Sequence, residues 1–121
     1  MMASFFETSA GLAIGYVSGG AVTQLTSKAT GVTVNAPSGA ITTHNASLAG
    51  NAEATFTVTN SSVTASDVVM VSVQSGASTG LYLAFVSATA AGSFDVTLSN
   101  LASTAGEVVV VNFAVMKAAA S

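Results

Sequence analysis

Short β-forming runs separated by turn residues recur along most of this 121-residue chain. From residue 21 onward, turn signals built from Gly, Asn, Ser and Pro come roughly every 8–15 residues. The runs between them are rich in Val and Thr, which pack well on a pleated surface and lose side-chain freedom in a helix. No window sustains the period of 3.6 that marks an amphipathic helix. The pattern predicts an all-β fold of about seven or eight strands, an antiparallel β-sandwich or jelly roll.

Two runs alternate strictly between apolar and polar residues. In residues 54–59, Phe56 and Val58 point one way and the threonines point the other. Residues 93–99 repeat this alternation with Phe94, Val96 and Leu98 on the apolar side. Both runs are predicted to be half-buried strands, as is typical of antiparallel sheets with one solvated face.

Three further runs are apolar on both faces: residues 67–74, 81–87 and 107–116. Their valine content favours strand over buried helix. Because both faces are apolar, the second face is also expected to meet protein, either as a central strand or in a subunit contact. From the five runs together we predict a core made of Phe56, Val58, Val69, Val71, Leu83, Phe85, Phe94, Val96, Leu98, Val109, Val111 and Phe113.

Residues 35–39 contain the only proline of the chain and a glycine, and they separate two short β-forming runs, residues 32–34 and 40–42. Pro and Gly at these places are typical of a tight turn. The segment is therefore predicted to connect the two runs as a hairpin.

Charged residues make up only 6% of the chain, and the net charge is −3. With two lysines and no arginine there is no basic patch for nucleic acid. A lone domain normally relies on mixed surface charges for solubility, so the scarcity of charge indicates an assembly subunit whose surface is covered by neighbours. Asp67 and Glu107 each begin an apolar run, where a charge commonly guards against strand aggregation.

No constellation of residues points to catalysis. His44 is the only imidazole, no G-x-S-x-G elbow is present, and the five carboxylates are scattered singly. The chain has no cysteine and no calcium-loop or phosphate-loop motif. We therefore expect no enzymatic activity, no catalytic residue, no metal, no cofactor and no small-molecule substrate.

Residues 1–20 read as an extended arm, and residues 21–121 as the β-sandwich domain. Residues 8–27 lack charge over the length of a membrane span, but polar side chains interrupt them and no Lys or Arg precedes them. We expect no membrane partner and no signal peptide, since Glu7 stands where positive charge would be needed. The large apolar side chains of the arm are predicted to bind a neighbouring subunit: Phe5, Phe6, Leu12, Ile14 and Tyr16.

About four fifths of the chain resembles small β-structured virion proteins of tailed bacteriophages, of the kind called capsid decoration or cement proteins. The similar stretches are residues 27–35 (SKATGVTVN), 39–43 (GAITT), 56–61 (FTVTNS), 91–94 (AGSF) and 111–117 (VNFAVMK). These motifs are structural, and the first 20 residues lie outside the resemblance.

The resemblance implies a small sandwich that forms a homotrimer on the outer capsid surface and clamps neighbouring copies of the major capsid protein. It also implies synthesis in the cytoplasm of the bacterial host and no direct contact with nucleic acid. Two other readings stay open at this point. One is a tail, baseplate or fibre-associated protein of the same virus, and the other is an adhesin-type β-sandwich module of a bacterial surface.

Overall fold

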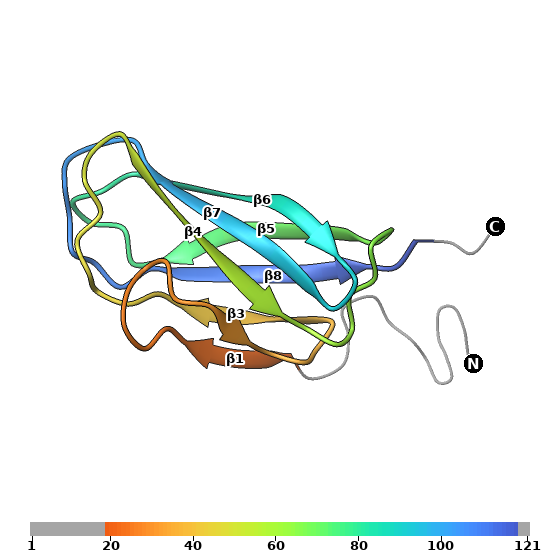
Figure 1. The fold of residues 1–121 in the computed structure, drawn as a ribbon. Coiled ribbons are helices and arrows are strands. Elements are labelled where there is room, and N and C mark those ends of the chain that lie inside the picture. Colours follow the sequence, from red (N-terminus) through yellow and green to blue (C-terminus); the bar gives the residue numbers. More distant parts are fainter. Residues whose placement is uncertain (1–18, 119–121) are drawn as a thin grey trace.

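The computed structural model describes residues 19–118, and over this range the chain is all-β, with eight strands and no helix (Figure 1). The strands form two four-stranded sheets. Their bounds are β1 (Gly20–Thr23), β2 (Val32–Thr33), β3 (Ser38–Thr42), β4 (Ala52–Thr59), β5 (Val68–Ser75), β6 (Tyr82–Ala90), β7 (Ser93–Asn100) and β8 (Val110–Met116).

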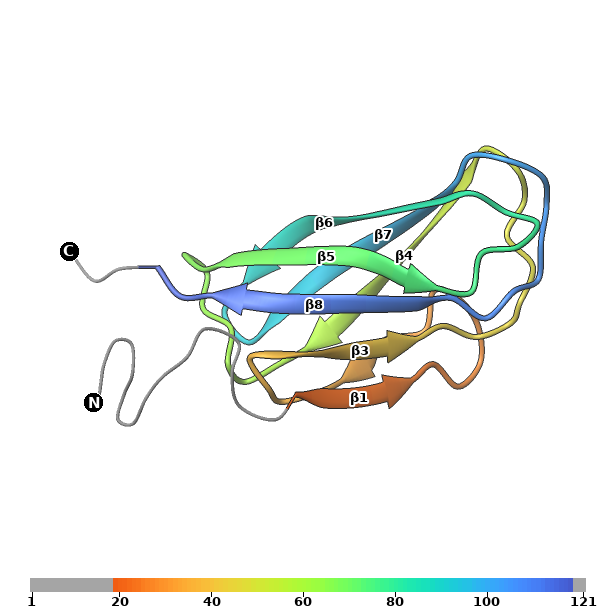
Figure 2. The same cartoon turned by 180° about the vertical axis from the view of Figure 1, so that it is seen from behind.

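Both sheets are mixed. The first sheet has the strand order β1-β3-β8-β5, which Figure 2 shows from its outer side, and the second has the order β2-β4-β7-β6. Most neighbours are antiparallel, but β1 runs parallel to β3 and β2 runs parallel to β4. The prediction of an all-β fold of seven or eight strands is confirmed, whereas the purely antiparallel arrangement is wrong for these two pairs.

The predicted hairpin at residues 35–39 is also wrong, because β2 and β3 belong to different sheets. The connecting segment is held by both sheets. The amide of Val34 donates to the carbonyl of Thr59 in the second sheet, whereas the carbonyl of Pro37 accepts a 2.7 Å bond from the Val115 amide in the first. The turn residues therefore carry the chain across the core instead of reversing it within one sheet.

The two sheets pack against each other through a shared core. The rings of Phe94 in the second sheet and Phe113 in the first lie with centroids 5.5 Å apart. Eight of the twelve predicted core residues are buried, and Val69 and Val71 pack half-buried against the same cluster. The eight buried residues are Phe56, Val58, Phe94, Val96, Leu98, Val109, Val111 and Phe113.

The prediction for β6 is wrong by one residue, since Leu83 and Phe85 point outward and are exposed. The strand instead turns Tyr82, Ala84 and Val86 toward the core. A one-residue shift moves every side chain of a strand to the other face. Because both faces of this run are apolar, its own sequence pattern does not distinguish the two registers.

The two alternating runs are confirmed as strands that turn their apolar face to the core, and they pair with each other as β4 and β7. The half-buried pattern is confirmed for β4, but it is wrong for β7, where Thr97 and Ser99 on the polar face are also buried. Phe56 lies opposite Val96 and Val58 lies opposite Phe94 on the core side. On the outer side, the hydroxyls of Thr55 and Thr97 are 2.8 Å apart. A second cross-strand bond joins the Thr57 hydroxyl to the Asp95 carboxylate at 2.7 Å, so the polar faces of the two strands are linked to each other.

Candidate assembly interface

Strands β5 and β6 end their respective sheets on the same side of the molecule, and both views show them side by side (Figures 1 and 2). We call these two strands the double edge. An edge strand presents unpaired N–H and C=O groups, and proteins usually protect long edges with charges or proline. Neither β5 (VVMVSVQS) nor β6 (YLAFVSATA) contains either, although each has one register irregularity. The opposite edges β1 and β2 are only four and two residues long.

Large apolar side chains gather on the outer face of the second sheet beside the double edge. Their exposed fractions lie between 38% and 59%. Leu81 is joined to Leu101 by a 2.7 Å backbone hydrogen bond from the Leu101 amide, so the two lie on neighbouring chain segments. We call this set the leucine patch; its members are Leu81, Leu83, Phe85 and Leu101.

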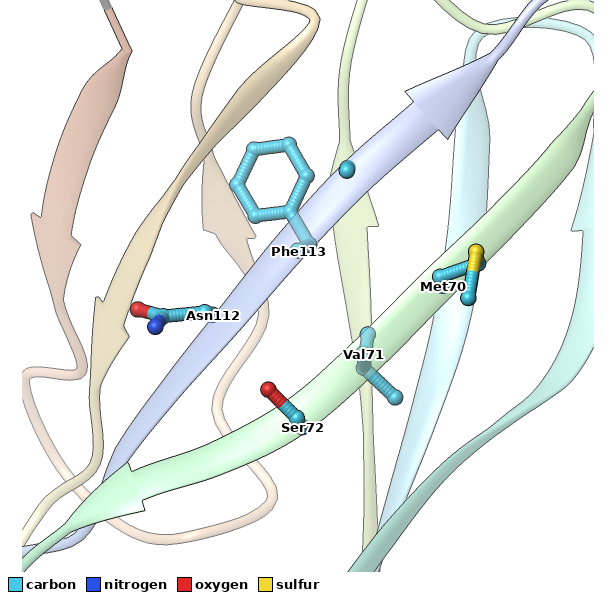
Figure 3. A pocket seen from close by; sticks show the side chains of 6 residues that line it. Met70, Val71, Ser72, Asn112 and Phe113 are labelled. Atoms are coloured by element: carbon cyan, nitrogen blue, oxygen red, sulfur yellow. The ribbon is translucent and has the colours of Figure 1, made fainter. Parts of the chain in front are cut away.

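A second apolar set lies on the outer face of the first sheet, on β5 and β8. Val68 lies opposite Met116, and Met70 lies opposite Ala114. The three larger side chains, Val68, Met70 and Met116, are 55–57% exposed and form what we call the methionine patch. A shallow pocket of about 240 Å³ lies beside Met70, and its lining residues are Met70, Val71, Ser72, Asn112, Phe113 and Ala114. Figure 3 shows the side chains of these residues.

Glu107 organises the loop that joins the two strands of the double edge. One carboxylate oxygen accepts hydrogen bonds from the amide and hydroxyl of Ser78 and from the amide of Thr79, at 2.6–2.8 Å. The other accepts the amide of Gly80 and the hydroxyl of Tyr82, both at 2.8 Å. These donors hold the pKa of Glu107 well below its ordinary value, the Ser78 hydroxyl most strongly.

Tyr82 connects this loop to the core. It is a buried residue at the start of β6, and burial together with the bond to Glu107 raises the pKa of its hydroxyl to about 12. The phenol therefore stays protonated and donates at any physiological pH. Tyr82 is on the core side of β6, and the alternation of side chains along the strand places Leu83 and Phe85 on the outside.

Lys28 is buried, and its ammonium group donates a hydrogen bond to the backbone of Glu107, the residue that organises the loop between β5 and β6. Its Nζ donates to the carbonyls of His44, Ala46 and Glu107, the last two at 2.9 and 2.7 Å. Burial lowers the pKa of Lys28, and the Glu107 carboxylate acts in the opposite direction. The ammonium group joins three loops that are far apart in the sequence, so its role is structural.

Asp67 and Lys117 form an ion pair of 2.6 Å at the other end of the molecule. The Asp67 carboxylate also accepts the amides of Thr64 and Ala118. Lys117 and these amides hold the pKa of Asp67 below its ordinary value. The predicted role of Asp67 and Glu107 as guards against strand aggregation stays a prediction; in the folded chain both carboxylates accept several hydrogen bonds that shape loops.

These two carboxylates make the folded state sensitive to acid. Their pKa values are lower in the folded chain, so their stabilisation is present at neutral pH and is lost as the pH falls below about 4, the ordinary range of carboxyl groups. We expect a lower melting temperature at pH 3 than at pH 7, measured by circular dichroism. Glu107→Gln turns an amide NH₂ toward N–H donors, so it should lower the melting temperature at pH 7 and lose part of this pH dependence. Glu53→Gln, at an exposed position on β4, is the matched control, and equal melting temperatures of the parent chain at both pH values would contradict the assignment.

The one histidine is engaged by its own loop, since its Nδ1 accepts a 3.0 Å hydrogen bond from the amide of Ala46. Within residues 19–118 no group of three or more His, Cys, Asp or Glu side chains is placed to hold a metal ion. No helix of this described part is long and apolar enough to cross a membrane.

The predicted interface residues Phe5, Phe6, Leu12, Ile14 and Tyr16 lie outside the described residues. The described part begins at Gly19, and β1 starts at Gly20, the last residue assigned to the arm. The two patches were not predicted as exposed surfaces. The sequence feature that could have revealed the patches is the apolar character of residues 67–74 and 81–87 on both faces. This feature indicated either a central strand or a subunit contact. In the structure both runs are edge strands.

In comparisons with known proteins, the chain matches no family model, no curated protein and no solved structure.

Proposed function

We propose that this protein is a non-enzymatic structural subunit of a virus particle, whose described part is a β-sandwich that assembles through its double edge. The observation that carries the proposal is the pair of adjacent, long, uncharged edge strands with exposed apolar side chains on either side. Such an edge is an aggregation hazard in a free monomer and a suitable surface in an assembly. The two parallel strand pairs favour the general sandwich class over a strict jelly roll.

The distribution of charge supports an assembly role. Four of the seven charged side chains, Lys28, Asp67, Glu107 and Lys117, make bonds that hold loops together. Few charges are left to solvate the surface, so neutral surface must be shared with neighbours. Within residues 19–118 neither the leucine patch nor the methionine patch contains a charged residue, which accords with a partner that is itself protein.

The resemblance to capsid decoration proteins gives this role a location. On that basis the chain forms a homotrimer on the outer capsid surface, stabilises contacts between major capsid proteins, and is made in the cytoplasm of the bacterial host. The arm, with Phe5, Phe6, Leu12, Ile14 and Tyr16, would bind a neighbouring subunit. Burying each such side chain contributes roughly 1.5–3 kcal/mol before ordering of the chain is subtracted.

Two measurements test the proposal. Analytical ultracentrifugation of the full chain at micromolar concentration should show a trimer, because an isolated copy leaves both patches in water. Immunogold labelling of the source virus with an antibody against the chain should mark the capsid at hundreds of copies per particle. A stable monomer with unlabelled particles would contradict the proposal. Label confined to a few copies at the tail would replace the capsid location by a tail or baseplate location.

A further inference from the structure

The core between the two sheets is incompletely covered along the double edge. On β5, the core-facing side chains of Val69, Val71 and Val73 are only partly buried, and the same holds for Ala84 and Val86 on β6. The core-facing side chains of the central strand β7 are, by contrast, almost completely buried. Within the described residues, this side of the sandwich therefore combines an unpaired backbone edge with apolar side chains that another strand would cover.

Residues 11–16 (GLAIGY) have the sequence pattern of such a strand. The large apolar residues Leu12, Ile14 and Tyr16 alternate with glycine and alanine, so in a strand all three would point to one face. The segment has no charged residue, and its six residues fit along the eight residues of β5. We propose that residues 11–16 of one copy bind as an added strand along β5 of a second copy, with the large side chains over its core-facing valines. This inference rests on the proposed function as an assembly subunit, and it names the segment and the edge that join the copies.

The place where the described chain begins excludes pairing with β5 of the same copy. β1 starts at Gly20 at one end of the first sheet, and β5 is the strand at the other end of the order β1-β3-β8-β5. Neighbouring strands lie about 4.8 Å apart, so a strand added beyond β5 would lie about 19 Å from β1. The four steps of chain from Tyr16 to Gly20 span at most about 14 Å when fully extended. The segment therefore reaches β5 only in another copy.

The free edge of β1 is the alternative that the segment can reach within its own copy. β1 is only four residues long, and Val22 is the one valine that it packs, partly buried, against the core. β5 offers eight residues and three such valines. Main-chain hydrogen bonds supply the affinity of strand addition, so the longer edge is the better partner.

Two substitutions at neighbouring positions test the alternation. Ile14→Glu puts a carboxylate on the face that packs on the valines, whereas Ala13→Glu puts the same group on the opposite face. In sedimentation of the full chain at micromolar concentration, the parent and Ala13→Glu should be oligomers and Ile14→Glu should be a monomer. The far-ultraviolet circular dichroism of Ile14→Glu should match that of the parent, because position 14 lies outside the eight strands of the sandwich.

Disulfide trapping locates the segment, because the chain has no cysteine of its own. Paired residues of neighbouring strands have Cα atoms about 4.5–5.5 Å apart, a separation that a disulfide can bridge. Val71→Cys is therefore combined in turn with Leu12→Cys, Ile14→Cys or Tyr16→Cys. Under mild oxidation, the combination that matches the register should link separate chains into dimers and larger species. Ala13→Cys combined with Val71→Cys is the control and should stay unlinked, since position 13 faces the other way.

The other outcomes separate the possible failures. If the parent chain is a monomer, the proposed assembly fails and this inference falls with it. If the parent is an oligomer and Ile14→Glu is one too, the copies meet elsewhere, so the inference is overturned while the assembly role stands. Dissociation by both glutamate variants would show that the arm joins copies without the proposed alternation, and would also overturn it. A disulfide within one chain between Tyr16→Cys and Val22→Cys would show that the arm folds back on β1, which overturns the exchange between copies.

Discussion

Replacing Phe94 by Ala should lower the free energy of unfolding by about 3–5 kcal/mol, the usual cost of emptying a buried aromatic site. Phe94 is buried, stands on the central strand β7 and packs on Phe113 across the two sheets. Its removal leaves a cavity between the layers that neither sheet closes. For a domain of about 100 residues this corresponds to a fall in melting temperature of more than about 12 °C.

Phe85→Ala is the matched control, because the same side chain is removed from the outer face of β6. It should cost about 1 kcal/mol, the span of strand preference at an exposed position. Both variants should be melted at the lowest workable concentration, since Phe85 belongs to the leucine patch and its loss also weakens association. Equal losses for the two variants would show that β6 presents its other face to the core.

Lys28→Met should be the second severe substitution. Methionine keeps the apolar stem, but it leaves the carbonyls of His44, Ala46 and Glu107 without their shared donor. A buried acceptor left unpaired costs about 1–3 kcal/mol, so we expect a loss of about 3 kcal/mol or more. Urea unfolding followed by circular dichroism measures the change.

Lys117→Met is the control for this experiment, because the chain has only these two lysines. The Lys117 side chain is 57% exposed, and without it the Asp67 carboxylate still accepts the amides of Thr64 and Ala118, so its loss should be smaller. Equal stability of Lys28→Met and the parent chain would show that the three loops are held without the ammonium group. If Lys28→Met changes the m-value, which is the slope of the unfolding free energy against urea concentration, as well as the urea midpoint, the substitution has altered the unfolded state.

The sequence by itself determined the fold class and most of the core. Strict alternation in residues 54–59 and 93–99 identified β4 and β7 and the correct face of each, because only one face of each run is apolar. The paucity of charge predicts a chain that needs neighbours, and this stays a prediction. Periodicity is reliable in these places since burial of the wrong face would place threonine, serine and aspartate in the core.

Only the tertiary structure decided the rest. On the inward face of β6, Tyr82 donates a hydrogen bond to Glu107, a contact between residues 25 positions apart that no local pattern contains. At residues 35–39 the chain passes from the second sheet to the first, and backbone hydrogen bonds to both sheets hold this segment. A turn motif in the sequence does not reveal such bonds. The runs that are apolar on both faces become central or edge strands according to which strands pair beside them. Pairing is a property of the whole sheet, so the exposed double edge, on which the proposed assembly rests, could be recognised only after the chain was folded.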